Sequence, residues 1–237
     1  MKVDQLLTEK QFVDELNAIG EQLYHHKHPF HIRMHEGSLT PEQLRIWVRN
    51  RFYYQSILPI KDAIIVSKLP DSENRRQWLK RIIDQDGDGI SAGGIESWIR
   101  LGEGMGVKRT EMLDVGSLGL VAKDAVDSYV DFCRERSWLE AVAASLTELF
   151  APKLVADRVE VFKRHYDWIQ PQALQYFFTR LTQAPRDSEH ALRLVLANAT
   201  NANEQRLITY ALRFKCRLLW RLLDCIEEDC RRETEYI

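Results

Sequence analysis

Six cationic side chains stand inside aromatic and apolar stretches of this 237-residue sequence. The stretches include NRFYYQ, LQYFFTR and LRFKCRLLW, and the cations are Arg51, Lys61, Arg81, Arg158, Arg180 and Lys215. A cation in such a stretch tends to be half-buried, and a buried cation needs an anionic partner. Because arginine binds carboxylate through two parallel hydrogen bonds, converging stretches would form a pocket for a compact ligand with several carboxylates.

Two other groups of residues have types and spacings that could bind a metal ion instead. Asp187 and His190 have the i, i+3 spacing that helical bundles use for paired irons, and Glu148 could join them. The plainer interpretation is that Asp187 caps a helix and His190 is a hydrogen-bonded interior residue. Five histidines also share one window that a proline interrupts, namely His25, His26, His28, His31 and His35. We favour a site without a metal.

The segment DQDGDG resembles the first half of a calcium-binding loop. Asp84, Asp86 and Asp88 alternate as such a loop requires, and Gly89 follows them. The twelfth position is Ile95, however, and the expected acid, Glu96, comes one residue late. We therefore favour the end of a helix followed by a glycine-rich turn.

The elements that must position these residues are predicted to be helices. Phe12, Leu16 and Ile19 have helical spacing, and capping boxes begin at Thr8 and Thr40. Pro59 is expected to break or kink its helix. The sequence predicts an all-α protein with one domain over 1–237, and helices over about 9–24, 41–57, 60–69, 72–85, 94–103, 120–136, 138–150, 153–164, 171–184, 187–198 and 203–231.

The charge balance and hydropathy exclude several classes of protein. With 33 Lys and Arg against 35 Asp and Glu, the net charge of −2 excludes the broad basic surface of a non-specific nucleic-acid binder. The longest uncharged stretch, 168–179, is shorter than the roughly 20 apolar residues that span a membrane. The opening MKVDQLLTEKQF lacks the features of a secretory signal, and the four cysteines form neither a disulfide framework nor a CxxC pair. We expect a cytoplasmic protein.

Eight stretches in the same order along nearly the whole chain resemble the pyrroloquinoline-quinone synthase family, within the helical thiaminase II and haem oxygenase-like proteins. The stretches are YHHKHPFH (24–31), WVRNRFYYQSILPIKDA (47–63), RRQWLKRIIDQDGD (75–88), GGIESWIRLGEGMG (93–106), AVDSYVDF (125–132), SLTELFAP (145–152), LTQAPRDSEHAL (181–192) and LRFKCRLLW (212–220). Such distributed agreement is more specific than a single short motif.

The resemblance implies a compact seven-helix bundle of the haem oxygenase-like type, assembled as a homodimer. It also implies an oxidase that needs neither a metal nor an organic cofactor. Its partners would be a bicyclic tricarboxylate quinone precursor and O2. The family closes a third ring on this precursor, oxidises it by eight electrons and releases hydrogen peroxide.

The resemblance gives the cationic residues a role. Arg51, Lys61, Arg81, Arg158, Arg180 and Lys215 match positions where the family binds the substrate's carboxylates and quinone oxygens, and the pocket is completed by Tyr24, His25, Gln55, Tyr129 and Thr147. Tyr176 and Arg180 match the pair that handles oxygen, and His25 is a possible acid or base. The cations would stabilise negative charge on the quinone oxygens while the surrounding helices exclude water.

The sequence departs from the family at three places. Gln85 in DQDG stands where the family has a histidine that is thought to act at the oxygen end of the site. Val155 replaces a second histidine that many members carry, and Lys123 replaces a loop arginine. Glutamine can form hydrogen bonds but cannot exchange protons near neutral pH. Substrate binding is thus expected to be intact, and slow catalysis, a shifted substrate or an earlier stop in the oxidation remain open.

Three further functions remain as alternatives. The first is a metal-dependent oxygenase on the same bundle, with Glu148, Asp187 and His190 as ligands. The second is a paralogue that binds a different anionic aromatic substrate. The third is a thiaminase-like hydrolase with Cys133 as nucleophile, or a non-catalytic partner protein.

Overall fold

The computed structural model describes residues 5–117 and 119–235, and these contain helices and no strand. The first four residues of the segment from which we predict the lack of a secretory signal lie outside the described residues. The α-helices are α1 (Glu9–Leu23), α2 (Pro29–His35), α3 (Pro41–Lys68), α4 (Ser72–Asp86), α5 (Gly93–Gly104), α6 (Arg109–Leu113), α7 (Leu120–Glu135), α8 (Trp138–Ala144), α9 (Ala151–His165), α10 (Gln175–Asn198) and α11 (Ala202–Glu235). Short 3-10 helices are η1 (His25–Lys27), η2 (Val115–Ser117), η3 (Ser145–Phe150) and η4 (Pro171–Leu174).

The prediction of an all-α protein is confirmed, and the expected count of seven helices is wrong. Eleven α-helices occur in the described part of the chain because short helices such as α2 and α6 punctuate the longer ones. The predicted helix over 138–150 is divided as well, since its second half winds as the 3-10 helix η3.

Prolines account for most of the other differences. α3 continues through Pro59 and α10 through Pro185, so the predicted breaks at these places are wrong. Each proline removes one backbone hydrogen bond, at a cost of about 3 kcal/mol, which the burial of long helices on both sides can offset. Pro29 does not interrupt a helix either. It occupies the first turn of α2, where the His28 side chain accepts a hydrogen bond from the backbone N–H of Phe30.

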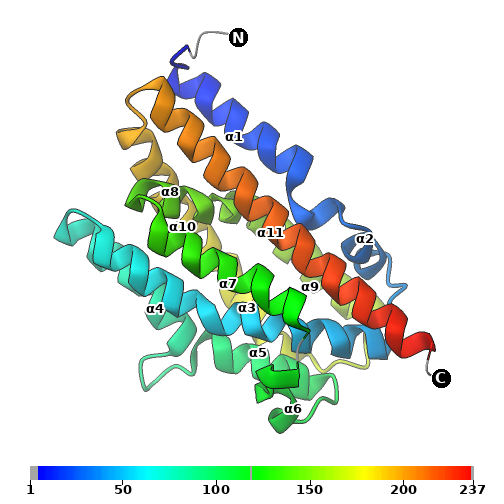
Figure 1. Ribbon diagram of the computed structural model, residues 1–237. Coiled ribbons are helices and arrows are strands. Elements are labelled where there is room, and N and C mark those ends of the chain that lie inside the picture. Colours follow the sequence, from blue (N-terminus) through cyan, green and yellow to red (C-terminus); the bar gives the residue numbers. More distant parts are fainter. Residues whose placement is uncertain (1–4, 118, 236–237) are drawn as a thin grey trace.

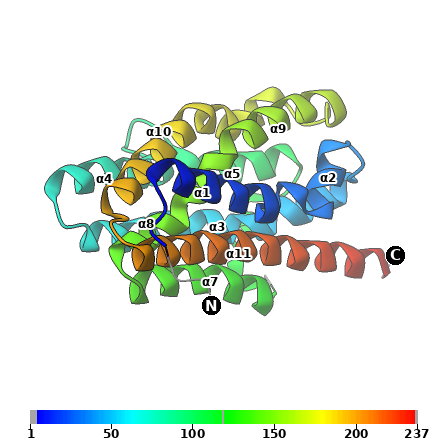
Figure 2. The ribbon, with the colours of Figure 1, turned by 90° about the horizontal axis from the view of Figure 1, so that it is seen from above.

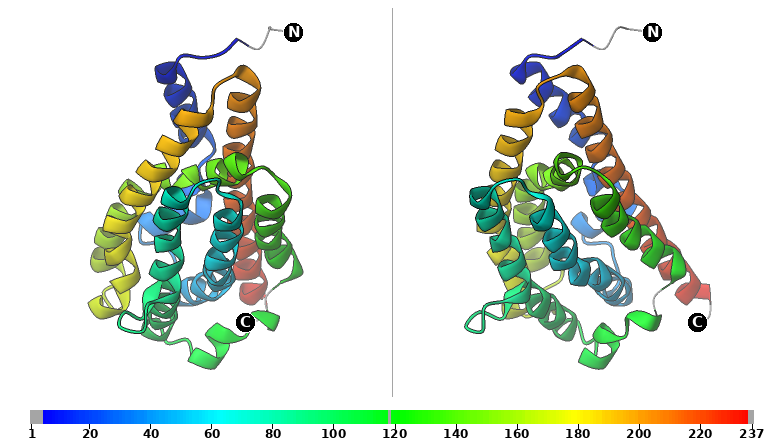
Figure 3. Two further views of the ribbon diagram at one scale, coloured as in Figure 1. Left: turned by 90° about the vertical axis from the view of Figure 1, so that its left-hand side faces the viewer. Right: turned by 60° about the vertical axis from the view of Figure 1, so that its left-hand side comes forward.

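The longest helix, α11, extends along the whole molecule, and α1 packs beside its first half (Figure 1). Seen from above, α1 and α7 lie on opposite sides of α11 (Figure 2). α3 is the central helix, since it packs against α4, α5, α7, α8 and α11. α6 lies at one end of the bundle (Figure 3). No helix among the described residues is long and apolar enough to cross a membrane.

The segment formed by α8 and η3 lies in the interior and contacts α3, α10 and α11. Every residue from 141 to 147 is buried, and the three alanines at 141, 143 and 144 leave room for neighbouring helices. A 3-10 helix places residues three apart on one side. Ser145 and Glu148 therefore lie on the same side of η3, and both contact cationic side chains of other helices.

Candidate active site

One face of α3 supplies much of the site. Arg51, Tyr54, Gln55, Lys61 and Asp62 recur at spacings of three, four and seven residues, which place them along one side of a helix. All are buried except Arg51, which is half-buried with its guanidinium 4.4 Å from the centre of the Tyr54 ring. Neither polar atom of the fully buried Gln55 side chain has a hydrogen-bond partner among the described residues. This face therefore presents unsatisfied polar groups to the interior.

Lys215 of α11 is 1% exposed, and its Nζ has no hydrogen-bond partner among the described residues. The ammonium lies 3.3 Å from the centre of the Tyr129 ring and 4.3 Å from that of Tyr54. Aromatic faces attract cations, but less strongly than a carboxylate does. Burial, assisted by Lys61 and Arg51, lowers the pKa of Lys215 well below its usual value. A bound anion would supply the missing partner.

Lys61 has partners of its own. Its Nζ donates to Asp62 Oδ1 at 2.6 Å and to Ser145 Oγ at 3.3 Å. The same Asp62 oxygen accepts a hydrogen bond from Trp78 Nε1 at 2.7 Å. The Tyr129 hydroxyl lies 3.3 Å from Ser145 Oγ, so this network reaches the ring that contacts Lys215.

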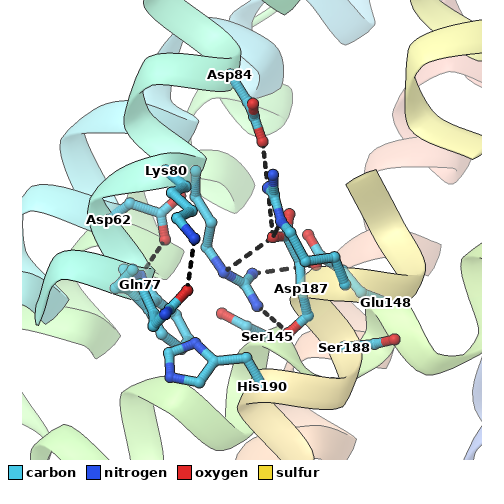
Figure 4. A network of polar contacts seen from close by, with 12 residues as sticks. Asp62, Gln77, Lys80, Asp84, Ser145, Glu148, Asp187, Ser188 and His190 are labelled. Carbon is cyan, nitrogen blue, oxygen red and sulfur yellow. Dashed lines mark hydrogen bonds and ion pairs between the residues drawn. The ribbon is translucent and has the colours of Figure 1, made fainter. Parts of the chain in front are cut away.

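Two arginines share two carboxylates between α4, η3 and α10. Arg81 Nη1 donates to Glu148 Oε2 at 3.0 Å, and Arg180 Nη2 donates to Glu148 Oε1 at 3.3 Å. Both arginines also lie within 4.0 Å of Asp187 carboxylate oxygens. Figure 4 shows Glu148 and Asp187 side by side, with Asp84 at the outer end, where Arg186 joins it to Asp187. Although burial opposes ionisation, Arg81 and Arg180 lower the pKa of Glu148.

Arg158 of α9 contacts a pair of buried histidines. Its Nη2 lies 3.2 Å from His31 Nε2, and His31 Nδ1 lies 2.9 Å from His25 Nδ1. The Tyr24 ring packs 4.2 Å from the ring of His25. Burial and the neighbouring Arg51 lower the pKa of Arg158 to about 10, so this arginine stays charged at neutral pH.

These clusters belong to one interior. The cations that act on the Glu148 carboxylate are Arg81, Arg180, Lys61 and Lys215. Lys215 in turn is repelled by Lys61 and Arg51, and Arg51 also repels Arg158. The structure thus brings all six cationic residues together, although they come from α3, α4, α9, α10 and α11.

Three further expected residues line the same helices. The ring of Tyr176, one turn before Arg180 on α10, packs edge-on against Trp98 at 4.8 Å. Thr147 is buried on η3. Gln85 is buried one turn after Arg81 on α4, and its Oε1 has no hydrogen-bond partner among the described residues. Gly94 leaves room for Gln85, since a Cβ there would lie 2.6 Å from Oε1.

The other two departures from the family occupy different surroundings. Val155 is buried one turn before Arg158 on α9. Lys123 lies in the first turn of α7 instead of a loop, with its Nζ 5.9 Å from the centre of the Tyr53 ring.

The alternative metal ligands are bound to other protein groups. Glu148 and Asp187 are paired with arginines, and His190 Nε2 lies 3.0 Å from Asn74 Oδ1. Asp187 lies inside α10, so the interpretation of this residue as a helix cap is wrong. Within residues 5–117 and 119–235, no group of three or more His, Cys, Asp or Glu residues could hold a metal ion.

The segment after Asp84 forms a turn, as favoured above. Gly87 has φ +85°, which glycine adopts readily, and Asp88 accepts hydrogen bonds from the backbone N–H groups of Ile90 and Ser91. The alternative nucleophile, Cys133, is also unsuited to its role. Burial raises the pKa of its thiol to about 11, so the reactive thiolate is scarce at neutral pH.

Four residues of the interior were not among the predicted site residues, namely His31, Tyr54, Asp62 and Ser145. Tyr54 and Asp62 could have been found, because they share a helical face with Arg51 and Lys61. The sequence pattern indicates His31 only as a candidate metal ligand. For Ser145 the sequence offers no signal, since its position depends on the 3-10 winding of η3.

A cavity of about 610 Å³ adjoins the histidine pair. Its walls come from α1, α2, η3 and α9, and include Gly20, His31, His35, Phe150 and Asp157. The Phe150 ring covers Gly20, where a Cβ would lie only 2.1 Å from the ring, and it packs 5.4 Å from the Tyr24 ring. His31 and Phe150 therefore lie between this cavity and the cationic interior.

The TENA/THI-4/PQQC family model matches residues 13–225. The chain belongs to this family. It is 43% identical over 222 residues to pyrroloquinoline-quinone synthase of Gluconobacter oxydans. The alignment covers 94% of this chain and 93% of the relative. It is 45% identical over 221 residues to the bifunctional coenzyme PQQ synthesis protein C/D of Methylorubrum extorquens. That alignment covers 93% of this chain but only 59% of the bifunctional relative.

Solved structures show the fold of this TENA/THI-4/PQQC family member. A protein domain from Shewanella denitrificans, described as having a heme oxygenase-like fold, superposes with a TM-score of 0.78 at 10% identity. The superposition covers 97% of this chain and 96% of the other. The expected haem oxygenase-like type of fold is thereby confirmed.

His35, one of the histidines that line the cavity, predicts a pH dependence of stability. Burial and Arg158 lower the pKa of His35 from 6.5 to about 4. The unfolded chain therefore binds this proton first, and the stabilisation, complete above about pH 6.5, is lost as pH falls through 4. We expect His35→Gln to reduce the loss of unfolding free energy between pH 6.5 and 4 in denaturant titrations. Equal slopes for both chains in this range would contradict the assignment, and above pH 7 the two slopes should agree.

Proposed function

We propose that the chain is a pyrroloquinoline-quinone synthase. It would close the third ring of the bicyclic tricarboxylate quinone precursor and oxidise the product with O2, releasing hydrogen peroxide. Membership of the TENA/THI-4/PQQC family and the relatives with this name support the proposal. The proposal carries with it the homodimeric assembly that the resemblance implies and the cytoplasmic location expected from the sequence.

The observation that carries the proposal is the imbalance of charged side chains in the interior. Seven basic side chains, the six named above and Arg186, face four carboxylates, those of Asp62, Asp84, Glu148 and Asp187. The cationic side chains are therefore in excess by three, which equals the number of carboxylates on the proposed substrate. Leaving buried charges unpaired is costly, so a tricarboxylate ligand would relieve an unfavourable feature of the ligand-free chain.

The cations without a carboxylate partner lie on one side of the site. Arg81, Arg180 and Lys61 already hold carboxylates of the protein, whereas Lys215 holds none and Arg158 contacts a histidine. We therefore assign substrate carboxylates to the side formed by Arg51, Arg158 and Lys215. Tyr24, Gln55, Tyr129 and Thr147 would complete the walls around the bound ring system.

The opposite side suits the reaction with oxygen. Tyr176 and Arg180 lie one turn apart on α10, and Arg180 donates a hydrogen bond to the Glu148 carboxylate. A fixed guanidinium there would stabilise negative charge on reduced oxygen, and the buried setting would keep bulk water from the reduced intermediates. The protein groups in this scheme bind, orient and stabilise charge. The scheme uses no metal and no organic cofactor.

The first test of the proposed function is turnover of the precursor. We expect anaerobic mixing of the chain with the bicyclic precursor to shift the precursor's absorption spectrum, and admission of air to give the tricyclic quinone and hydrogen peroxide. Spectrophotometry, a peroxide assay and mass spectrometry measure these steps. A spectral shift with no product in air would reduce the proposal to a binding paralogue, and no shift at all would point to a different anionic aromatic substrate.

The second prediction concerns Lys215→Met, which removes the unpartnered buried cation. Losing a hydrogen bond to a charged group costs about 1.5–3 kcal/mol, or roughly 10- to 150-fold in Kd for the precursor. The Tm should stay the same or rise, because a buried polar group without a hydrogen-bond partner among the described residues is replaced by an apolar side chain. Lys80→Met on the exposed face of α4 is the matched control and should leave Kd unchanged.

Proton uptake provides a second readout for Lys215. A bound carboxylate favours the charged ammonium, so binding should draw a proton from weakly buffered solution. We expect Lys215→Met to lose this uptake. Tight binding by Lys215→Met with unchanged proton uptake would show that Lys215 does not contact the substrate.

The third prediction concerns Gln85→His. The substitution introduces a group that exchanges protons near neutral pH, in the place beside Gly94 that the Gln85 amide occupies. General acid–base catalysis contributes about 10² to 10⁴ at its best, so we expect kcat to rise by roughly tenfold or more. Gln77→His, on the exposed side of the same helix, controls for the added charge. An equal kcat for Gln85→His and the original chain would show that proton exchange at this position does not limit turnover.

A further inference from the structure

His25 and His31 form a buried pair with a defined order of hydrogen bonds. Both side chains are almost fully buried, at 4% and 2% exposure. His31 Nδ1 lies 2.9 Å from His25 Nδ1 and 3.0 Å from the backbone carbonyl of His25. On the other side of its ring, His31 Nε2 lies 3.2 Å from Arg158 Nη2. Each contact restricts where the ring protons can be.

The guanidinium determines the tautomer of the first ring. Because arginine can only donate, His31 Nε2 must accept the hydrogen bond from Arg158. In a neutral imidazole the proton then resides on Nδ1, which donates to the acceptors facing it. One of these is the His25 carbonyl, which can only accept, so the assignment is consistent on both sides of the His31 ring.

The tautomer of the second ring follows from the first. His25 Nδ1 faces the donating Nδ1–H of His31, so it must act as an acceptor and carry no proton. The proton of a neutral His25 is then on Nε2. Burial lowers the pKa of both histidines well below 6.5, which keeps both rings neutral at pH 7. The charged and titratable groups that act on the pair are Arg51, Arg158, Lys215, His26 and His35.

We propose that Arg158 and His31 hold His25 as the Nε2–H tautomer, so that His25 meets the substrate as a neutral hydrogen-bond donor and not as a base. This inference rests on the proposed function. The Nδ1 lone pair of His25 is occupied by His31, so the ring has no free lone pair with which to take a proton. A neutral imidazole N–H can polarise a carbonyl and stabilise the charge that develops on its oxygen. His31 is a positioning residue in this arrangement.

The tautomers can be measured without turnover. Nitrogen-15 NMR of histidine-labelled full-length chain distinguishes a protonated ring nitrogen from an unprotonated one. At pH 7 we expect His25 to show a protonated Nε2 and an unprotonated Nδ1, and His31 to show the reverse. A proton on His25 Nδ1, or an imidazolium at either residue, would overturn the inference.

Two isosteric variants separate the two contacts of His31. In His31→Asn the amide nitrogen lies near the former Nδ1 and can still donate to His25. In His31→Gln the amide lies near the former Nε2, so it can meet Arg158 but not His25. Loss of a residue that orients an active group costs roughly tenfold to hundredfold, so we expect His31→Gln to lower kcat by this factor with little change in KM. His31→Asn should retain kcat close to that of the original chain.

The spectra decide between positioning and a merely structural role. We expect His31→Gln to give a mixture of His25 tautomers and His31→Asn to keep the Nε2–H form. Equal losses of kcat in both variants with the His25 tautomer unchanged would overturn the inference. If the original chain shows the expected tautomers but does not turn over the precursor in air, the proposed function fails while the assignment of the tautomers stands.

Discussion

The central feature of this interior is a group of cations that the protein's own carboxylates do not fully neutralise. Aromatic rings take the place of the missing anions. Lys215 lies over Tyr129 and Tyr54, and Arg158 lies 5.7 Å from the centres of two further rings, those of Trp47 and Phe177. Such contacts stabilise a desolvated cation by about 2 kcal/mol or more, which is less than burial costs it. Aromatic residues from the stretches around the cations thus stabilise these cations after burial.

The interior has two sides with different electrostatics. Between α4, η3 and α10, carboxylates alternate with guanidiniums, and the network ends at the surface with Arg186 and Asp84. On the other side, Arg51, Arg158 and Lys215 have no carboxylate partner within the described part of the chain. On the first side the cations are paired with carboxylates of the protein, and these ion pairs join the helices. The second remains unfavourable until an anion binds, an example of stability given up where function requires it.

Periodicity was sufficient for the fold wherever a helix had clear caps. α1 begins after the capping box at Thr8, as predicted, and α4 and α5 lie within about two residues of their predicted bounds. Several of the errors occur at prolines. Pro59 and Pro185 are local breakers that long buried helices override, and Pro29 begins a helix because its missing N–H falls in the first turn. Local propensity cannot show when packing compensates for a lost hydrogen bond.

The cationic part of the site could be predicted for a specific reason. A lysine or arginine in an aromatic stretch is anomalous, so Lys61 and Lys215 stand out in the sequence alone. Their partners do not, because Asp62 and Ser145 resemble surface residues until the helices are assembled. The same holds for Asp187, which suits a helix cap by type yet lies buried between arginines of two helices. Sequence therefore identifies the unusual member of a buried pair more readily than the ordinary one.

With Gln85 in place of a histidine, proton exchange in the interior depends on the other titratable groups there. Burial raises the pKa of Tyr24, Tyr54 and Tyr129, and it lowers the pKa of His25 and His31. All five shifts favour the neutral form at pH 7, so none of these groups exchanges protons readily there.

Lys215 differs from these groups, because burial lowers the pKa of its ammonium, while an anion bound beside it would favour the charged form. The paired cations already have a carboxylate of the protein for this purpose. A site without the usual histidine thus retains one buried group whose protonation follows the ligand. In the proposed function, binding of the anionic substrate would favour the protonated form of this ammonium, which has no hydrogen-bond partner among the described residues.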